Sequence, residues 1–227
     1  MYSNERGLFI VFEGIDGSGT TSQAKLLADY IKNELHFEDL VTTFEPTKGF
    51  YGRIIREILS GNREAYPETL AELFVIDSVE TNNKEIIKPT INRGGVVLSD
   101  RYRPSSFAYQ SATGISPDYI NELHERQKER LEIPDFTFYL DLNEDVAMKR
   151  TLSKLERIGA PPEIFEHLEF QSKVREKYRK IIEDKLEYFG RVIIINADNP
   201  VEQVSSDIQK EFTRIYTNWS ESNSSPV

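Results

Sequence analysis

Glycines, hydroxyl groups and one acidic side chain are crowded into a single stretch near the N-terminus, which reads Gly14-Ile15-Asp16-Gly17-Ser18-Gly19-Thr20-Thr21. It lies between an apolar, strand-like segment and a segment with helical apolar spacing. Glycines in such a turn let backbone N–H groups converge on an anion, and the start of the next helix adds partial positive charge. The stretch is therefore predicted to bind the phosphates of a nucleotide, and a turn that binds nothing is the alternative.

Two threonines end this turn and differ in what they imply. The spacing follows the phosphate-binding pattern G-x-x-x-x-G-K-[S/T], in which Thr21 takes the place of the hydroxyl that ligates Mg²⁺. Thr20 takes the place of the lysine. A lysine ~4 Å from a phosphate oxygen contributes roughly 4 kcal/mol at an effective dielectric constant of ~20, before desolvation is subtracted. Another cation must therefore substitute, or catalysis is weak.

A second polar group follows the apolar segment Val96–Leu98. Asp100 and Arg101 come directly after it, and ligands of parallel sheets bind outside the carboxyl ends of the strands. Asp100 is thus a candidate Mg²⁺ ligand, and Arg101 is a candidate phosphate ligand with a planar, forked guanidinium. The alternative for this pair is an ion pair that only caps the strand.

Basic residues mixed with helix breakers form a third candidate region, a mobile lid over about residues 149–165. Arg150, Lys154 and Arg157 are spaced to share one face of a helix, although a solvated basic face has the same spacing. Lids of phosphoryl-transfer enzymes exclude water and bring cations to the transferred group. We hypothesise that Arg150 with Lys154 or Arg157 supplies the positive charge that Thr20 does not.

The elements that must position these residues alternate along the chain. Five short apolar segments are predicted strands: Leu8–Phe12, Val41–Phe44, Val96–Leu98, Phe136–Leu142 and Val192–Ile195. Seven segments have helical spacing: Gln23–Leu35, Tyr51–Leu59, Pro67–Ile91, Pro117–Arg130, Glu144–Glu156, Phe165–Phe189 and Pro200–Tyr216. This alternation predicts an α/β protein of the three-layer P-loop NTPase fold, with a five-stranded parallel sheet flanked by helices and a helical lid. We expect one domain over residues 1–218 and a disordered tail over residues 219–227.

Composition excludes several classes of function. No apolar run approaches the roughly 20 residues of a membrane-spanning helix, and the N-terminus lacks the pattern of a secretory signal. The absence of cysteine fits a reducing cytoplasm. A formal net charge of −10 argues against a nucleic acid partner, whereas a small anionic ligand needs only a few local donors.

Further short motifs extend the pattern over nearly the whole chain. In order they are Phe12-Glu13-Gly14, Glu45-Pro46-Thr47, Ile55-Arg56, Leu73-Phe74, Asp100-Arg101-Tyr102, Ser105-Ser106-Phe107-Ala108-Tyr109-Gln110, Pro134-Asp135, Phe170-Gln171, Val174-Arg175 and Tyr178. Their order and spacing resemble the thymidylate kinase family of P-loop nucleoside-monophosphate kinases. The resemblance implies transfer of the γ-phosphoryl group of ATP to thymidine monophosphate, which supplies dTTP for DNA synthesis, with Mg²⁺ and in a homodimer.

The resemblance also implies roles for individual residues. Asp16 would contact the 3′-hydroxyl of the acceptor sugar or the metal site, and Arg56 and Arg101 would clamp the acceptor phosphate. Phe74 would stack on the thymine, although core packing is the alternative for this side chain. The rest of the acceptor pocket would comprise Glu45, Ser105, Tyr109 and Gln110. The catalytic candidates are Asp16, Arg101, Arg150, Lys154 and Arg157.

Several departures from the family leave the acceptor base open. Ser78 stands where an arginine is usual, and Phe44 stands where an arginine commonly precedes Glu45, so Arg53 and Arg103 are candidates to rebuild the phosphate clamp. The lid has Glu163-Ile164-Phe165-Glu166 where the family has basic residues. A kinase for another nucleoside monophosphate and a catalytically silent nucleotide-binding protein are the alternatives. A GTPase would need an Asn-Lys-x-Asp segment, which the sequence lacks.

Overall fold

The five predicted strands form one parallel sheet in the computed structural model, which describes residues 6–184 and 189–224. They are β1 (Leu8–Glu13), β2 (Leu40–Phe44), β3 (Val96–Asp100), β4 (Phe136–Asp141) and β5 (Arg191–Asn196), in the order β2-β3-β1-β4-β5. Phe12 of β1 pairs with Asp100 of β3 and Phe138 of β4. The glycine turn after β1 therefore lies beside the end of β3, as expected from the sequence.

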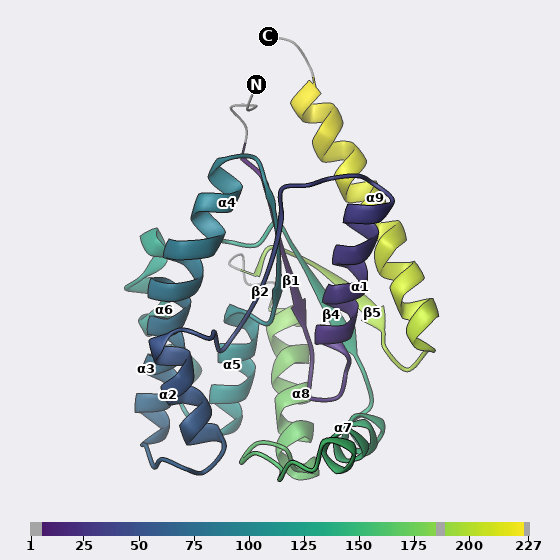
Figure 1. Cartoon of the computed structure of the whole chain (residues 1–227). Helices are drawn as coiled ribbons and strands as arrows, with labels where there is room; N and C mark the ends of the chain where they lie inside the picture. The colour runs from purple at the N-terminus through teal and green to yellow at the C-terminus, as the bar shows by residue number, and fades with distance from the viewer. Residues whose placement is uncertain (1–5, 185–188, 225–227) are drawn as a thin grey trace.

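Helices cover both faces of the sheet, so the predicted three-layer α/β fold is confirmed (Figure 1). One layer holds α1 (Thr20–Asn33) and α9 (Val201–Ser224), and the other holds α4 (Lys88–Asn92), α5 (Arg103–Ala112) and α8 (Leu168–Glu183). Side chains of β1 alternate between the layers. Ile10 belongs to the core cluster that contains Ile31 and Ile208, whereas Phe9 packs with Ile87 and Ile91.

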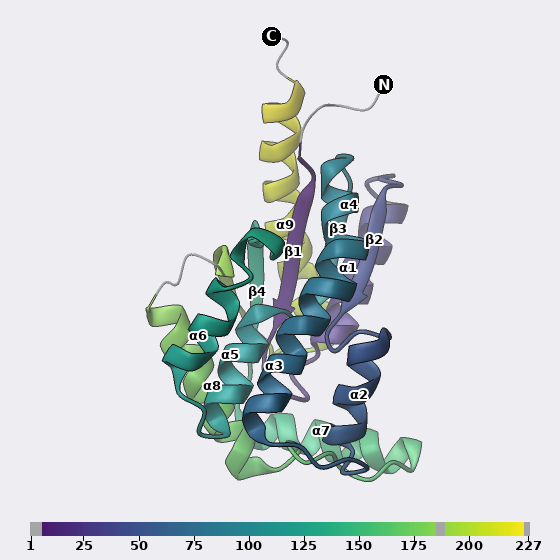
Figure 2. The same ribbon diagram turned by 90° about the vertical axis from the view of Figure 1, so that its left-hand side faces the viewer.

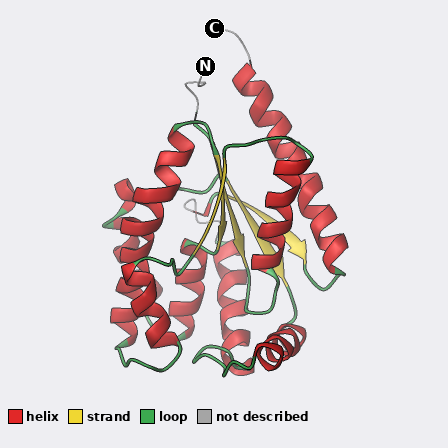
Figure 3. Cartoon of the chain, in the orientation of Figure 1, coloured by secondary structure: helices red, strands yellow, loops and turns green. Residues whose placement is uncertain are grey.

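Helix α6 (Pro117–Glu125) and the 3₁₀ turn η2 (Lys128–Arg130) lead back to the start of β4. Helices α2 (Phe50–Leu59), α3 (Pro67–Asp77) and α7 (Glu144–Ile158) lie toward the carboxyl end of the sheet. Figures 2 and 3 show α7 lying across this end, opposite the chain termini. No helix in the described ranges is long and apolar enough to cross a membrane.

The predicted helix Pro67–Ile91 is divided into three parts, which corrects the expectation. Between α3 and α4 the chain forms a π-helix, η1 (Ser78–Ile87). Asn83 is fully buried there, and its side-chain amide donates to the carbonyl oxygen of Ser78, five residues earlier. A side chain that takes a backbone carbonyl inside a helix interrupts the regular ladder, and apolar spacing does not reveal it.

Other boundaries also differ from the prediction. The predicted helix Pro117–Arg130 ends at Glu125, and residues 128–130 form the separate 3₁₀ turn η2. Helix α5 was not predicted, and α8 begins at Leu168 because the His167 side chain caps it. The predicted end of that helix, Phe189, follows residues outside the described ranges. The expected tail from Trp219 is instead helical to Ser224, because the Trp219 indole N–H donates to the Arg6 carbonyl and its ring packs on Phe37. Residues 225–227 lie outside the described part of the chain.

Candidate active site

The turn between β1 and α1 is folded as a cradle for an anion. Gly17 has φ +85°, and a Cβ there would lie 2.2 Å from the carbonyl oxygen of Ala147 on α7. Gly19 has φ +98° and leads directly into α1. Both positions need the freedom of glycine, which lets the turn pass closely under α7 and present its backbone N–H groups.

A cavity of about 650 Å³ opens above this turn. Its lining comprises residues 16–23 of the turn and α1, Arg101 after β3, Arg150, Thr151, Lys154 and Arg157 of α7, Glu166 before α8, and Ala197, Asn199, Pro200, Val201 and Val204 after β5. We call it the donor cavity. The buried hydroxyls of Ser18 and Thr151 have no hydrogen-bond partner among the described residues. Buried polar groups are normally paired, so these hydroxyls are available to a bound phosphate.

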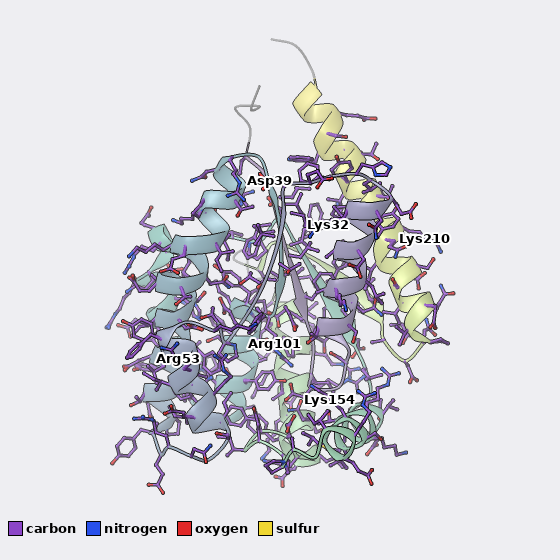
Figure 4. The ribbon with its side chains drawn as sticks, in the orientation of Figure 1. Lys32, Asp39, Arg53, Arg101, Lys154 and Lys210 are labelled. Carbon is purple, nitrogen blue, oxygen red and sulfur yellow. The ribbon has the colours of Figure 1, made fainter. Side chains whose placement is uncertain are left out.

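Three cations of α7, Arg150, Lys154 and Arg157, line the donor cavity. Arg150 Nη1 donates to the Ala197 carbonyl oxygen at 3.0 Å, which ties α7 to the loop after β5. Lys154 and Arg157 line the same cavity and form no ion pair within the described part of the chain. Figure 4 places Lys154 on α7 and Arg101 nearer the middle of the molecule. Thr20 is only 6% exposed and carries no charge into the cavity.

Thr21 and Asp100 meet at the predicted metal position. Thr21 Oγ1 donates to Asp100 Oδ2 at 2.5 Å, and the buried Oδ1 of Asp100 has no hydrogen-bond partner in the described ranges. An unpartnered carboxylate oxygen next to a hydroxyl beside the phosphate-binding turn fits the oxygen ligands that Mg²⁺ prefers. These two residues would hold the ion together with oxygens of a bound nucleotide.

Arg101 is held by several contacts at the end of β3. Its backbone has φ +71°, and its guanidinium donates to the Gly14 carbonyl at 2.9 Å, to Ser105 Oγ at 3.2 Å and to Asp16 Oδ1 at 2.5 Å. The guanidinium also lies 4.9 Å from the centre of the Tyr109 ring. Burial would lower the pKa of Arg101, but Tyr109 and Asp16 raise it above its ordinary value. Arg101 is therefore a fixed positive charge.

A smaller cavity of about 100 Å³ lies on the other side of Arg101, and we call it the acceptor cavity. It is lined by Asp16, Glu45, Pro46, Leu59, Phe74, Arg101, Tyr102, Ser105, Ser106, Tyr109, Gln110 and Phe165. Gln110 is fully buried, and neither its Nε2 nor its Oε1 has a partner among the described residues. An aromatic face, an unpaired amide and a guanidinium suit a planar base that carries a phosphate.

Asp16 and Arg101 line both cavities, so they lie where a donor and an acceptor would meet. Sequence reasoning gave no role to Gln171, which holds Asp16 in place. Its Oε1 accepts from the Asp16 backbone N–H at 3.0 Å, and its Nε2 donates to Asp16 Oδ2 at 2.7 Å and to the Phe165 carbonyl at 2.9 Å. Gln171 therefore links α8 to the phosphate-binding turn and to the loop after α7.

Comparison with known proteins agrees with this geometry. Residues 12–208 match the family model described as thymidylate kinase. This chain belongs to the thymidylate kinase family. It is 42% identical over 205 residues to a probable thymidylate kinase of Methanococcus aeolicus, covering 89% of this chain and 94% of the relative. A probable thymidylate kinase of Pyrococcus abyssi is 39% identical over 209 residues, covering 89% and 94% of the two chains.

Some residues expected from the thymidylate kinase resemblance lie outside the acceptor cavity. Arg56 does not line it and instead donates to the Pro46 carbonyl at 2.8 Å, so it borders the cavity through that loop. Arg53 and Arg103 do not line the cavity either, and Arg103 is only 2% exposed. Among the described residues, Arg101 is the basic side chain that lines this cavity, so a role for Arg53 or Arg103 in the clamp stays a prediction.

The position of the usual family arginine is occupied by the buried Ser78. Nearby, Asn82 Nδ2 donates to Glu45 Oε1 at 2.8 Å. Burial raises the pKa of Glu45 to about 8, while hydrogen bonds from Asn82 and Ser78 offset part of that rise. Neutral donors therefore surround Glu45 on this side of the acceptor cavity, where an arginine would have brought a charge.

Glu13 is a second residue of the site without a role from sequence reasoning. It ends β1 and is 0% exposed, and burial raises its pKa to about 7 against the opposing effects of Ser105 and Arg101. The sequence offered two signals for it, its place in the motif Phe12-Glu13-Gly14 and its position at the end of an apolar strand. Neither signal shows which donors the carboxylate meets.

Proposed function

We propose that this chain transfers the γ-phosphoryl group of ATP to the phosphate of thymidine monophosphate and releases thymidine diphosphate and ADP. The observation that carries the proposal is the pair of adjoining cavities, which share Asp16 and Arg101. Phosphoryl transfer needs two phosphates aligned for in-line attack and compensation of the charge between them. The names of the relatives support thymidine monophosphate as the acceptor.

The residues divide the work between the two cavities. Backbone N–H groups of the turn from Gly14 to Thr21 bind the phosphates of ATP, and Arg101 presents the acceptor phosphate as the nucleophile. Lys154 and Arg157 compensate charge on the transferred group. Mg²⁺, when bound by Thr21 and Asp100, supplies further positive charge at the phosphates of the nucleotide.

Phe74 and Gln110 recognise the base of the acceptor. Phe74 offers a ring face for stacking, and the amide of Gln110 offers one donor and one acceptor, which match the adjacent N–H and carbonyl groups of thymine. The Gln110 amide can also turn to match cytosine, so it does not separate thymine from cytosine. We infer that the neighbouring hydrogen-bond network of Glu45, Ser78 and Asn82 makes that distinction.

Assembly and compartment complete the proposal. A homodimer is proposed from the family resemblance, and the exposed Phe50, Tyr66 and Ile76 of the α2–α3 side offer apolar surface for it. Sedimentation of the purified protein tests this assembly. The use of ATP fits the cytoplasmic location proposed from the sequence.

A coupled assay of ADP release tests the reaction. We expect ADP to form only when an acceptor is added, with thymidine monophosphate giving the highest kcat/KM among thymidine, deoxyuridine, deoxycytidine, deoxyguanosine and adenosine monophosphates. Gln110→Leu keeps the size of the side chain, removes its polar groups and should raise the KM of thymidine monophosphate by about tenfold or more. ADP release without an acceptor, a preferred purine acceptor, or no release at all would overturn the proposal.

A further inference from the structure

Glu13 is a fully buried carboxylate that joins three elements of the site. It ends β1, directly before Gly14 of the phosphate-binding turn. Its two oxygens accept hydrogen bonds from the turn between β3 and α5 and from Tyr178 of α8. Neither the proposed chemistry nor the expected family roles use this group, yet a buried carboxylate persists only where it is well paired.

One oxygen of Glu13 fixes the backbone that follows Arg101. Oε1 accepts from the backbone N–H of Tyr102 at 2.8 Å and from that of Ser105 at 3.3 Å. These N–H groups lie at the start of α5, where a negative charge is favoured, and that of Ser105 also donates to the Tyr102 carbonyl at 3.1 Å. Glu13 therefore caps α5 from a neighbouring strand, just after the residue whose φ is +71°.

The other oxygen of Glu13 sets the direction of a hydrogen-bond chain. Oε2 accepts from Ser105 Oγ at 2.5 Å and from the Tyr178 hydroxyl at 2.7 Å. Ser105 has a single hydroxyl hydrogen, and with that hydrogen on Glu13 its lone pair faces Arg101. Arg101 Nη1 donates to this lone pair at 3.2 Å.

We propose that Glu13 is a positioning residue for the acceptor: through Ser105 and the backbone at the start of α5, it holds the Arg101 guanidinium between the two cavities. The inference rests on the proposed role of Arg101 in binding the acceptor phosphate. Its geometric content is a continuous chain from Arg101 to Ser105 to Glu13, alongside which Arg101 also donates to the Gly14 carbonyl and Ser105 Oγ lies 2.8 Å from the Tyr178 hydroxyl. Fixing a guanidinium before the ligand arrives removes an entropic cost of binding.

Glu13→Gln is the variant that tests this hydrogen-bond chain. It keeps the size of the side chain and replaces one hydrogen-bond acceptor, a carboxylate oxygen, by a donor, an NH₂ group. Its single oxygen must still accept from the backbone N–H groups of Tyr102 and Ser105, so its NH₂ group points at Ser105 Oγ. The NH₂ group then competes with Arg101 for that oxygen, and Arg101 loses a fixed partner. Assays at about pH 8 keep the native residue mainly ionised, since burial raises its pKa to about 7.

The expected result is a change that affects the acceptor alone. Glu13→Gln should raise the KM of thymidine monophosphate by about tenfold or more and leave the KM of ATP within about twofold. Glu13→Asp, which keeps the charge but is shorter, should give a smaller rise with the same selectivity, and it replaces Glu13→Gln if that variant does not fold. An equal rise in both KM values, or a loss of thermal stability with both KM values unchanged, would overturn the inference.

Tyr178→Phe is the matched control. It removes a hydroxyl that lies 2.7 Å from the same Glu13 oxygen and 2.8 Å from Ser105 Oγ, but it leaves the direct links from Arg101 to Ser105 and from Ser105 to Glu13 in place. It should lower stability and leave the acceptor KM within about twofold. An acceptor KM raised as much as in Glu13→Gln would mean that Glu13 acts only through general packing.

Arg101→Lys separates this inference from the proposed function. A lysine cannot make the forked contacts of the guanidinium, so the acceptor KM should rise by more than in Glu13→Gln. If Arg101→Lys leaves that KM unchanged, the role of Arg101 fails, and the inference fails with it. If Arg101→Lys raises the KM and Glu13→Gln does not, the proposed function stands and only the positioning role of Glu13 is refuted.

Discussion

The positive charge that is missing at Thr20 can be tested by removing its replacement and then restoring the usual lysine. Lys154 and Arg157 line the donor cavity and have no ion-pair partner among the described residues, so they are the cations free to turn toward a triphosphate. Changing both to alanine should lower kcat while ATP still binds. Adding Thr20→Lys to that double variant should return most of the lost rate.

The expected size follows from the charge and its exposure. One unit charge ~4 Å from a phosphate oxygen contributes roughly 4 kcal/mol at an effective dielectric constant of ~20. Both side chains are exposed in the structure, so solvent screening reduces the net effect. A loss of about 1–2 kcal/mol of transition-state stabilisation per cation corresponds to about five- to thirtyfold in kcat.

The assay is ADP release at saturating ATP and acceptor, together with ATP affinity from calorimetry. Lys149→Ala is the matched control, because Lys149 is exposed on the same helix and does not line the donor cavity. Its kcat should stay within about twofold of the parent value. Arg150→Ala is expected to differ from both, because Arg150 binds the Ala197 carbonyl and its loss should also weaken ATP binding through the loop after β5.

Two results would refute this reasoning. If the Lys154 and Arg157 double variant keeps the parent kcat, the cations of α7 do not compensate the transferred charge. If the double variant is slow and Thr20→Lys does not restore its kcat, Lys154 and Arg157 do not take over the function of the lysine that the turn usually carries. In that second case the two cations act at another step, such as closure of the lid.

Gly17 and Glu45 give two further predictions. Gly17→Ala should lower the free energy of unfolding by about 1–3 kcal/mol and weaken ATP binding, because the new Cβ would clash with the Ala147 carbonyl. Gly61→Ala is the control: Gly61 has a φ of +75° but open space around it, so the loss of stability should come from backbone strain alone. Urea unfolding measures both changes. Burial raises the pKa of Glu45 from 4.5 to about 8, so its contribution to stability is full below about pH 4.5 and is lost progressively as the pH rises from there to about 8. Glu45→Gln should therefore flatten the fall of Tm between about pH 4.5 and 8, and an unchanged slope in that range would contradict the assignment.

Sequence periodicity predicted the strands because each is a short apolar run between turn residues. Local apolar content decides where a buried strand forms, so all five strands lie where they were expected, within two residues at each end. Helix α5 was missed for a physical reason. It begins at Arg103 and Pro104, immediately after the turn that carries Arg101, and its stability depends on the distant Glu13 cap as well as on its own spacing.

The prediction of a disordered tail after Trp219 fails through residue 224 for a similar reason. Serine, asparagine and glutamate after Trp219 are poor in apolar groups, which predicts a disordered tail. The helix continues because Trp219 lies against Phe37 and binds the Arg6 carbonyl, two contacts that come from distant parts of the chain. Composition describes a segment by itself, whereas this helix is stabilised by what it touches.

Site residues that meet a ligand can be assigned a role from their type and order, whereas Glu13, Gln171 and Tyr178 occur in the family motifs without any sign of the residue that each one holds. Glycine spacing and the Asp100-Arg101 pair could be read directly because the ligand dictates their type and order. Gln171 lies 155 positions from Asp16, and Tyr178 lies 165 positions from Glu13, so the partners meet only after the sheet and α8 have packed. Each is also a polar side chain on a helix whose apolar spacing is ordinary. If the inference about Glu13 is correct, such residues decide acceptor affinity as strongly as the groups that touch it, and the Glu13→Gln and Tyr178→Phe pair separates that effect from stability.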